Sequence, residues 1–327
     1  MKAVLVKSPG DADQLYIGEA PMPETGDGDL LVRVKATALN RADLLQRRGL
    51  YPPPPGASDI IGLEMAGTVV SRGKRCQRFQ PGDRVFGLLP GGGYAEYVAI
   101  PEGMTMPIPD NLSFEEAAAI PEAFLTAFQA LHWLGGFREG HIVLIHAGAS
   151  GVGTAAIQLV REGGGRAIVT AGSEPKLQVC RALGATDAFN YKQGPFAEKV
   201  LEVTHGHGAD IIIDFVGASY LDQNLTAIAV DGRMVVLSLL GGSVAERFDM
   251  RKLMRKRARI EGSTLRGRSL EYKIKLTTDF SQYALPRFHS GALKPVIDRV
   301  FSWKEVSEAH RYMEANKNIG KIILRID

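Results

Sequence analysis

Short apolar runs separated by turn-forming residues fill the first third of the chain. Each run is rich in β-branched and apolar residues and is bounded by Gly, Pro or Asp, which is typical of short strands. The runs are Leu30–Lys35, Glu64–Val70, Arg84–Leu88 and Ala95–Ile100. The segment Tyr51–Gly56 (YPPPPG) is predicted to be an extended loop, because Pro fits neither a helix interior nor a central strand. Strands that follow one another without crossover helices predict a compact, β-barrel-like domain.

The pattern changes at Ser113, where a Ser-x-x-Glu capping box opens a segment with helical periodicity that continues to Leu134. Beyond it, buried-looking strands alternate with helices that begin near Val152 and Pro175. The predicted strands are His141–His146, Arg166–Thr170, Ile211–Phe215 and Arg233–Leu237. This alternation is typical of a parallel, doubly wound α/β sheet.

The last part of the chain, from about Glu261, has mixed patterning. It ends in a predicted helix around Trp303–Glu314 and a predicted strand, Lys321–Ile326. Because this final strand needs a sheet partner, we expect the C-terminal part to return to the N-terminal domain.

Composition narrows the class of protein. The 327 residues are 45% hydrophobic and 23% charged, with a net charge of +3, which is typical of a globular enzyme and not of a nucleic-acid or membrane protein. Only two cysteines occur, Cys76 and Cys180, so a disulfide framework is not expected and a reducing, cytoplasmic compartment is favoured. The N-terminal apolar run is too short for a signal sequence, and no run reaches the roughly 18 apolar residues of a membrane span.

A glycine turn joins a strand to a helix in the segment His141–Gln158 (HIVLIHAGASGVGTAAIQ). In this context a glycine motif is specific for a dinucleotide, because free N–H groups at the helix start bind the pyrophosphate. We expect Gly148 to make the tight turn and Gly153 to permit close helix–strand packing. Ser150 takes the place of the middle glycine of the strict pattern, and it adds a hydroxyl but narrows the approach. The alternative is a strand-to-helix turn that binds nothing.

The tip of the next predicted strand bears on the choice of nucleotide. NAD-dependent enzymes commonly place an acidic residue there, about 20 residues after the turn, to hold the ribose hydroxyls. Here the tip is Gly172 and Ser173, followed by Lys176, and a hydroxyl with a cation suits a 2′-phosphate. Glu174 argues for NADH unless its side chain points to solvent. We therefore favour NADPH over NADH.

Two further strand ends carry small residues, at Val216-Gly217 and at Ser238-Leu239. Ligands of open α/β sheets bind at the carboxyl ends of the strands, so these positions are candidates for contact with the nicotinamide half. The alternative is simple strand termination.

The whole chain resembles the zinc-free medium-chain dehydrogenase/reductases of the quinone oxidoreductase (zeta-crystallin-like) class. The segments that carry the resemblance are ALNRADL (38–44), GLEMAGTV (62–69), PGDRVFGL (81–88), GGGYAEYV (91–98), IPEAFLTAFQAL (120–131), HAGASGVGTAAIQL (146–159) and YMEANKNIGKIIL (312–324). The resemblance implies a GroES-like β-barrel catalytic domain, residues 1–122 and 262–327, and a Rossmann NADPH-binding domain, residues 123–261. It also implies NADPH in the interdomain cleft and a homodimer or tetramer.

By matching position, the resemblance implies a set of cofactor-binding residues. Asn40, Tyr51 and Thr126 would lie near the nicotinamide; Ser150, Gly151, Val152 and Gly153 would meet the phosphates; Ser173, Lys176 and Tyr191 would surround the 2′-phosphate; and Val216, Gly217, Ser238, Leu265 and Asn318 would complete the wall.

The comparison with the zinc-dependent relatives also shows what is missing. Their catalytic Cys region reads Asn40-Arg41-Ala42-Asp43 here, and their His-Glu pair reads Leu63-Glu64. A tetrahedral zinc site cannot be built from these residues. The pair His205 and His207 lies in a predicted surface turn without nearby cysteines, so no metal site is expected there. Without a Lewis acid, hydride transfer favours electron-poor acceptors, either quinones or activated alkenes.

Three residues are candidates for catalysis. Tyr51 stands in a rigid loop, and in enoyl reductases of the superfamily a tyrosine in a similar context donates a proton; here it can act as an acid, stack near the nicotinamide or only pack the loop. Asn40 and Asp43 can polarise a substrate or order water, or they can cap the helix Arg41–Arg47.

A basic cluster and one strand raise two other possibilities. The basic residues of Arg247–Arg259 favour a solvated helix face, and a nucleic-acid-binding or structural role is the alternative class of function. In the superfamily that the chain resembles, the final Rossmann strand, here RMVVLSLL (233–240), can pair across a twofold axis, so the resemblance implies a homodimer formed by this strand.

Overall fold

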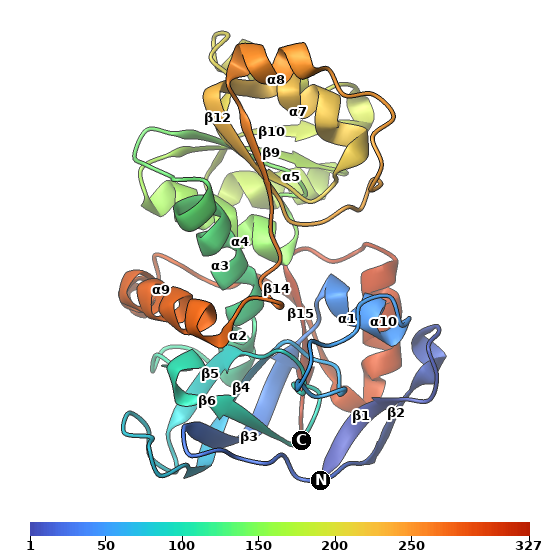
Figure 1. Ribbon diagram of the computed structural model, residues 1–327, viewed down its shortest axis with the longest axis vertical. Helices are drawn as coiled ribbons and strands as arrows, with labels where there is room; N and C mark the ends of the chain where they lie inside the picture. Colours follow the sequence, from blue (N-terminus) through green and yellow to red (C-terminus); the bar gives the residue numbers. More distant parts are fainter. The chain divides into compact units, whose positions relative to one another are not determined.

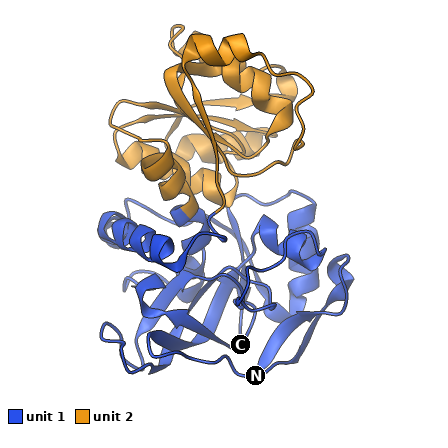
Figure 2. Cartoon of the chain, viewed as in Figure 1, with its two compact units in different colours: residues 1–125, 265–327 blue, residues 126–264 orange.

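A computed structural model describes all residues from 1 to 327. The chain forms two compact units, unit 1 (residues 1–125 and 265–327) and unit 2 (residues 126–264), shown in blue and orange in Figure 2. Both divisions lie a few residues beyond the predicted boundaries at 122/123 and 261/262. The first division falls inside a helix, where a sequence pattern gives no signal.

Unit 1 is built on a seven-stranded sheet with the order β14-β15-β3-β4-β5-β7, in which β6 also pairs with β3. All of its strand pairs are antiparallel except β14 with β15. Its strands are β3 (Asp29–Ala38), β4 (Glu64–Arg72), β5 (Arg84–Leu88), β6 (Tyr97–Pro101), β7 (Thr105–Pro107), β14 (Ile297–Ser302) and β15 (Lys321–Arg325). A separate two-stranded sheet joins β1 (Lys2–Val6) to β2 (Leu15–Glu19).

The C-terminal strand β15 pairs with β3, so that Ile323 lies opposite Ala38 and Leu324 opposite Thr37. The prediction that the end of the chain returns to the N-terminal domain is therefore confirmed. In Figure 1 the red β15 lies in the same sheet as the blue β3. This pairing brings Lys321, the first residue of β15, to the start of the chain's first helix.

The helices of unit 1 are α1 (Arg41–Arg47), α2 (Phe114–Ala118), α3 (Pro121–Phe128, which crosses the division), α9 (Leu270–Ser290) and α10 (Val306–Glu314), with short 3-10 turns at η1 (Ala12–Gln14), η2 (Glu102–Met104) and η6 (Trp303–Glu305). The long helix α9 was not predicted. Its N-cap Ser269 accepts a hydrogen bond from the Tyr272 N–H, which is a usable sequence signal, and Pro286 lies inside the helix.

The predicted helical segment from Ser113 to Leu134 is helical but is divided into separate helices. The capping box is present, since the Glu116 N–H donates to Ser113 Oγ (3.1 Å) and the Ser113 N–H donates to Glu116 Oε2 (2.9 Å). The helix nevertheless ends at Ala118, and Pro121 begins α3. Proline has no N–H to continue the first helix but fits the first position of a new one. A π-helix, η3 (Gln129–Leu134), follows.

Unit 2 holds a six-stranded parallel sheet with the order β10-β9-β8-β11-β12-β13. Its strands are β8 (Ile142–Ile145), β9 (Arg166–Ala171), β10 (Ala185–Asn190), β11 (Ala209–Asp214), β12 (Ile228–Val236) and β13 (Arg259–Gly262). Its helices are α4 (Gly151–Glu162), α5 (Glu174–Ala182), α6 (Ala197–Val203), α7 (Leu221–Ala227) and α8 (Met250–Lys256), with 3-10 turns at η4 (Tyr191–Gln193) and η5 (Ala218–Tyr220). The predicted doubly wound sheet is confirmed, and its strand order reverses between β8 and β11.

The core of unit 2 explains why its strands read as continuous apolar runs. Leu144, Ile168 and Ile212 lie on adjacent strands, are fully buried and pack with Phe196 and Val200. Helix α4 is also buried over most of its length. A sheet covered on both faces needs apolar side chains on both faces of each strand.

The prediction that RMVVLSLL forms the outer edge of the sheet is wrong. Strand β12 pairs with β13 on its outer side, with Met234 opposite Ile260. The edge is therefore β13, whose four residues are all exposed. The short sequence RIEG carries too weak a pattern to be recognised as a strand.

Across the whole chain, no helix is both long and apolar enough to span a membrane.

Candidate functional site

The turn between β8 and α4 differs in detail from its prediction. Ala147, not Gly148, takes the left-handed conformation, with φ of 47°. Gly148 is needed for packing, because a Cβ at this position would lie 2.8 Å from Val169 Cβ on β9. A Cβ on Gly153 would lie 2.5 Å from the Ala147 carbonyl oxygen. The two glycines therefore press the turn against the next strand and against the first turn of α4.

The N-terminus of α4 is open to an anion. Ser150 is the N-cap, and its Oγ accepts a hydrogen bond from the Gly153 N–H (3.1 Å). The first backbone bond of the helix runs from the Thr154 N–H to the Ser150 carbonyl (2.8 Å). The N–H groups of Gly151 and Val152 precede that bond and have no place in the helical ladder. Such groups, together with the helix dipole, attract phosphate.

The predicted 2′-phosphate residues Ser173 and Lys176 follow the tip of β9, and Tyr191 reaches that tip. A Cβ on Gly172 would lie 2.6 Å from Tyr191 Oη, so the glycine leaves room for the tyrosine at this strand end. Ser173 is the N-cap of α5, but its side chain makes no capping hydrogen bond. Lys176, one turn into α5, is partly buried. Glu174, which argued for NADH, is 58% exposed and pairs with Arg181 (2.6 Å), as solvent-facing placement predicts.

The ends of β11 and β12 are joined to each other. The Gly241 N–H donates to the Val216 carbonyl (2.7 Å), and Ser238 and Leu239 lie in the loop that leads to it. Gly217 has φ of 82°, and a Cβ there would lie 2.8 Å from the Gly242 carbonyl oxygen. The predicted residues at these two strand ends therefore form one surface of close backbone approach.

A buried polar network that was not predicted fixes these strand ends. His146, at the end of β8, lies 2.9 Å from Thr170 Oγ1 and 2.7 Å from Asn224 Oδ1 through its two ring nitrogens. Asn224 Nδ2 donates to Asp214 (3.3 Å), whose carboxylate accepts from the Val216 N–H (2.7 Å). Burial lowers the pKa of His146 to about 4, so its imidazole is neutral. The sequence did contain a signal for this network, because polar residues stand at the ends of the buried strands β8, β9 and β11.

Two predicted cofactor residues each carry a buried polar atom without a partner. Thr126 Oγ1 in unit 2 and Asn318 Oδ1 in unit 1 make no hydrogen bond. Buried polar groups are nearly always paired, so both atoms are available to a ligand or to water. Leu265, also predicted, is buried.

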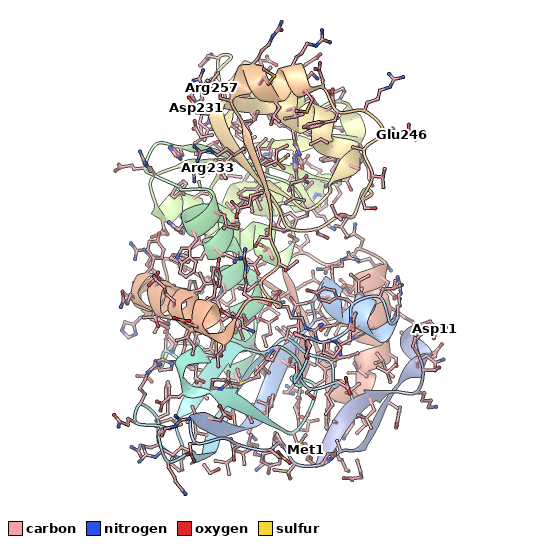
Figure 3. The ribbon with its side chains drawn as sticks, in the orientation of Figure 1. Met1, Asp11, Asp231, Arg233, Glu246 and Arg257 are labelled. Carbon is pink, nitrogen blue, oxygen red and sulfur yellow. The ribbon has the colours of Figure 1, made fainter.

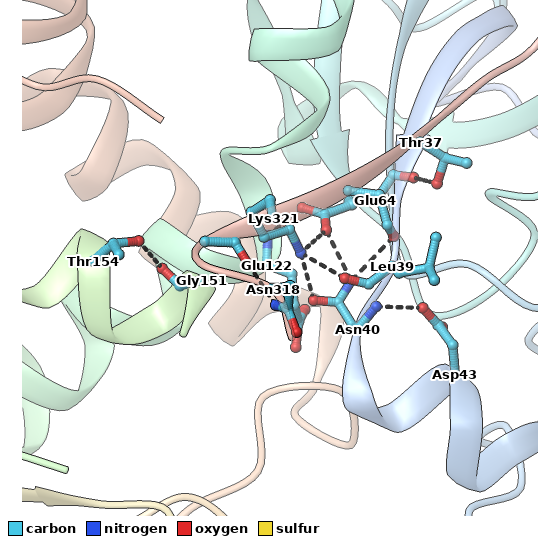
Figure 4. A network of polar contacts seen from close by, with 12 residues as sticks. Thr37, Leu39, Asn40, Asp43, Glu64, Glu122, Gly151, Thr154, Asn318 and Lys321 are labelled. Carbon is cyan, nitrogen blue, oxygen red and sulfur yellow. Dashed lines mark hydrogen bonds and ion pairs between the residues drawn. The ribbon is translucent and has the colours of Figure 1, made fainter. Parts of the chain in front are cut away.

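In unit 1, Lys321 connects β15 to the start of α1 (Figure 4). Its ammonium donates to Glu64 Oε1 (2.6 Å), Asn40 Oδ1 (2.7 Å) and the Leu39 carbonyl (3.0 Å), which uses all three of its protons. Asn40 Nδ2 donates to the same Glu64 oxygen (2.8 Å). Glu64 is fully buried, and its charge is balanced by Lys321.

Asp43 lies behind this network and is fully buried. Its Oδ2 accepts from the Asn40 N–H (2.7 Å), which is the capping role weighed for it, and from Tyr94 Oη (3.2 Å). Its Oδ1 has no hydrogen-bond partner. Burial raises the pKa of Asp43 to about 7, against the opposing effects of Asn40 and Lys321. Asp43 can hold Asn40 in place, but it has no exposed surface for a substrate.

Tyr51 is held by Arg266. The Arg266 guanidinium lies 5.2 Å from the centre of the Tyr51 ring, and it donates to the Tyr51 carbonyl (3.4 Å), Gln46 Oε1 (2.7 Å) and the Pro90 carbonyl (2.8 Å). Burial raises the pKa of the Tyr51 phenol above its usual value.

Glu122 is the remaining acid of this region. It is the second residue of α3, and its backbone N–H donates to Glu64 Oε2 (2.8 Å). Burial and the neighbouring Glu64 carboxylate raise the pKa of Glu122 to about 8.

The sequence did not reveal Glu122, Arg266 or Lys321. Their partners lie far away along the chain, and Lys321 is 257 positions from Glu64. One signal was present: Glu64 and Lys321 each stand inside an apolar run, and charged residues are buried only when they are paired.

No group of three or more His, Cys, Asp or Glu side chains in the chain is arranged to hold a metal ion. His205 and His207 are exposed in the turn before β11, as predicted, and His207 pairs with Asp210 (2.8 Å). The two cysteines are both buried and unpaired.

The basic cluster of residues 247–259 lies on and around α8, and Figure 3 shows Arg257 beside Asp231. Several of its cations are paired with aspartates: Arg257 with Asp231 (2.6 Å) and Lys252 with Asp222 (2.6 Å). This pairing favours the solvated helix face over a nucleic-acid surface.

Comparison with known proteins agrees with this geometry. Residues 26–110 match the alcohol dehydrogenase GroES-like domain, and residues 151–282 match the zinc-binding dehydrogenase family. Human quinone oxidoreductase is 30% identical over 330 residues, which covers 99% of this chain and 97% of that protein. The chain belongs to the medium-chain dehydrogenase/reductase family. The predicted GroES-like and Rossmann architecture is thereby confirmed.

Solved structures of this family cover the chain almost completely. An NAD-dependent alcohol dehydrogenase is 34% identical with a TM-score of 0.88, and covers 100% of both chains. A mycobacterial protein solved in complex with NADPH is 28% identical with a TM-score of 0.89, covering 99% of this chain and 100% of that one. The CurK enoyl reductase is 26% identical with a TM-score of 0.86, covering 100% of this chain and 99% of that one. The family is thus an oxidoreductase family with more than one substrate class.

Proposed function

We propose that this medium-chain reductase uses NADPH to reduce a quinone, without zinc. The observation that carries the proposal is the β9 tip, where Gly172 leaves room for Tyr191 and the Ser173 side chain makes no capping hydrogen bond to α5. The alternative acceptor is an activated alkene, such as the substrate of an enoyl reductase. Human quinone oxidoreductase and the CurK enoyl reductase are relatives that support one acceptor class each.

The residues present fit NADPH. The N–H groups of Gly151 and Val152 would hold the pyrophosphate, and Ser173 with Lys176 would hold the 2′-phosphate. Thr126 of unit 2 and Asn318 of unit 1 each carry a buried oxygen without a partner, and their contact with the nicotinamide stays a prediction. When bound, NADPH supplies the hydride. The protein has to orient the acceptor and exclude water.

The choice of NADPH over NADH is tested at Lys176. A charge-assisted bond to the 2′-phosphate is worth about 1.5–3 kcal/mol, so Lys176→Ala should raise the KM for NADPH about 10- to 150-fold and leave that for NADH nearly unchanged. The measurement is steady-state kinetics with each nucleotide in turn. Lys199→Ala, on α6, controls for the loss of a lysine from unit 2. Equal effects on NADPH and NADH would remove the 2′-phosphate assignment.

The acceptor class is tested with a substrate panel. Under anaerobic conditions, NADPH oxidation is followed with a quinone series and with an α,β-unsaturated carbonyl series. Faster turnover with quinones supports the main proposal, and faster turnover with alkenes supports the alternative.

Salt-dependent retention of RNA that is lost on NADPH addition would instead favour the nucleic-acid role.

Three further features belong to the proposal. The zinc-free character rests on the residues at Asn40 and Leu63, where zinc-dependent relatives would need ligands. A cytoplasmic site of action rests on the two unpaired cysteines. The homodimer stays a prediction, and its expected interface is β13, because β13 and not β12 is the edge strand of the sheet.

A further inference from the structure

Glu122 combines two properties that the described chemistry does not use. Its side chain is partly exposed, whereas Glu64 and Asp43 beside it are fully buried. Its backbone N–H is bonded to Glu64, but its own carboxyl oxygens make no hydrogen bond with the chain. A carboxyl that is fixed by its backbone and unused by the fold is free to bond to a substrate.

Burial, together with the neighbouring carboxylates, favours the protonated form of Glu122. Lys321 donates its three ammonium protons to Glu64, Asn40 and Leu39, so it has no hydrogen bond left for Glu122. The charged and titratable groups that face Glu122 come from six segments: Glu64 of β4, Lys321 of β15, Asp43 of α1, Arg266 of the segment before α9, Lys273 of α9 and Tyr51 of the proline-rich loop. Burial and Glu64 outweigh the cations, and the pKa of Glu122 rises to about 8. The group therefore carries a proton at neutral pH.

Resting on the proposed reductase function, we propose that the Glu122 carboxyl is the proton donor to the reduced acceptor. A quinone gains a hydride, which NADPH supplies as two electrons and one proton, and it gains the second proton from the Glu122 O–H. The products are a hydroquinone, NADP⁺ and the Glu122 carboxylate, which is reprotonated from water. For an activated alkene the hydride adds to the β carbon and the same carboxyl protonates the α carbon.

Two neighbouring acids fit this role less well. Asp43 is fully buried and has no surface that a substrate could reach. Tyr51 has a pKa raised above its ordinary value of 10, so it is a weaker acid than Glu122 at neutral pH. A donor works best when its pKa lies near the working pH.

The test compares Glu122→Gln with the wild type across pH 6 to 10. The amide keeps the size of the protonated acid but has no acidic proton. We expect wild-type kcat to fall as pH rises through about 8, and Glu122→Gln to lower kcat roughly 100-fold and to abolish that fall. The KM for NADPH should stay within about two-fold of the wild type. Glu115→Gln, the same change one helix earlier, should retain the wild-type pH profile.

A second readout does not depend on turnover. The infrared difference between the wild type and Glu122→Gln, recorded without acceptor, should contain a carboxylic-acid C=O band of the wild type that disappears above about pH 8, because the difference removes the band of Asp43, whose pKa is about 7. A wild type that is active while Glu122→Gln keeps its kcat and its high-pH fall would overturn the donor role and leave the reductase function standing. Absence of the band at neutral pH would overturn it too. A wild type that reduces neither acceptor class would overturn the proposed function and the donor role together.

Discussion

Tyr51 illustrates how a single residue can be fixed without being reactive. Arg266 holds both its carbonyl (3.4 Å) and its ring (5.2 Å to the centroid), and the same guanidinium reaches Gln46 on α1. The phenol has a raised pKa, because burial disfavours its ionised form. These contacts favour the ring as a packing or stacking surface over the hydroxyl as an acid.

We therefore expect Tyr51→Phe to keep kcat within about three-fold of the wild type, and Tyr51→Ala to lose most of the activity, because only the second removes the ring. The measurement is kcat and KM with the best acceptor for both variants. Tyr16→Phe on β2 controls for the loss of a phenol elsewhere in unit 1. A Tyr51→Phe variant as inactive as Tyr51→Ala would show that the hydroxyl proton is needed.

At the residue scale the sequence predicted positions better than roles. Ser150, Ser173 and Gly217 were placed by the turn and strand-end pattern, and each lies at such an end. The left-handed residue of the tight turn, however, is Ala147. Gly148 is required for packing against β9, and that contact becomes visible only in the folded structure.

At the scale of elements, the strand ends of unit 2 are tied together by polar side chains. His146, directly after β8, bonds to Thr170 of β9 and to Asn224 of α7, and Asn224 bonds to Asp214 of β11. The ring of His146 also packs against Phe196 (4.7 Å) and Tyr220 (4.8 Å). A charged imidazole in this place would be both desolvated and crowded.

The network predicts how stability depends on pH. The pKa of His146 is about 4 when folded and 6.5 unperturbed, so between these values the unfolded chain binds more protons and stability falls as pH falls. The wild type should therefore lose unfolding free energy relative to His146→Gln, on the order of 3 kcal/mol, as pH falls from 6.5 to 4. Taking the difference cancels the opposite contributions of Asp43 and Glu122.

Chemical denaturation at several pH values measures this difference. His289→Gln, an exposed histidine at the end of α9, controls for the substitution. A wild-type advantage that stays constant between pH 6.5 and 4 would contradict a neutral, buried His146.

Elements with a local sequence signal could be predicted, and elements that depend on pairing with a distant segment could not. Helices α2 and α4 have local signals, a capping box at Ser113 and a turn before Gly151, and both were found. Strand β13 is four exposed residues, and its strand character comes only from pairing with β12. Pro121 marks the break between α2 and α3, but the apolar periodicity continues on both sides of it, so the sequence pattern did not locate the break.

At the scale of the whole molecule, the chain uses long-range pairs that no local pattern can contain. Lys321 joins Glu64 across 257 positions, and Arg266 joins Gln46 across 220. In unit 1 both pairs connect the C-terminal segment to the N-terminal one. The family resemblance predicted that the two ends of the chain share a domain. The individual charged pairs could be identified only from the folded structure.

The free edge of unit 2 leads to the last prediction, the homodimer. Strand β13 exposes its outer backbone groups and Ile260, which is 39% exposed, and an unprotected edge is a template for a second strand. Pairing of β13 with its copy about a twofold axis would extend the six-stranded sheet across two chains. Ile260→Lys should then shift the species measured by light scattering at micromolar concentration from dimer to monomer, because like charges would meet near the axis. Val300→Lys, the same kind of change on β14 at the edge of the other sheet, should leave the dimer intact. A monomeric wild type would contradict the dimer, and dissociation by Val300→Lys alone would move the interface to unit 1.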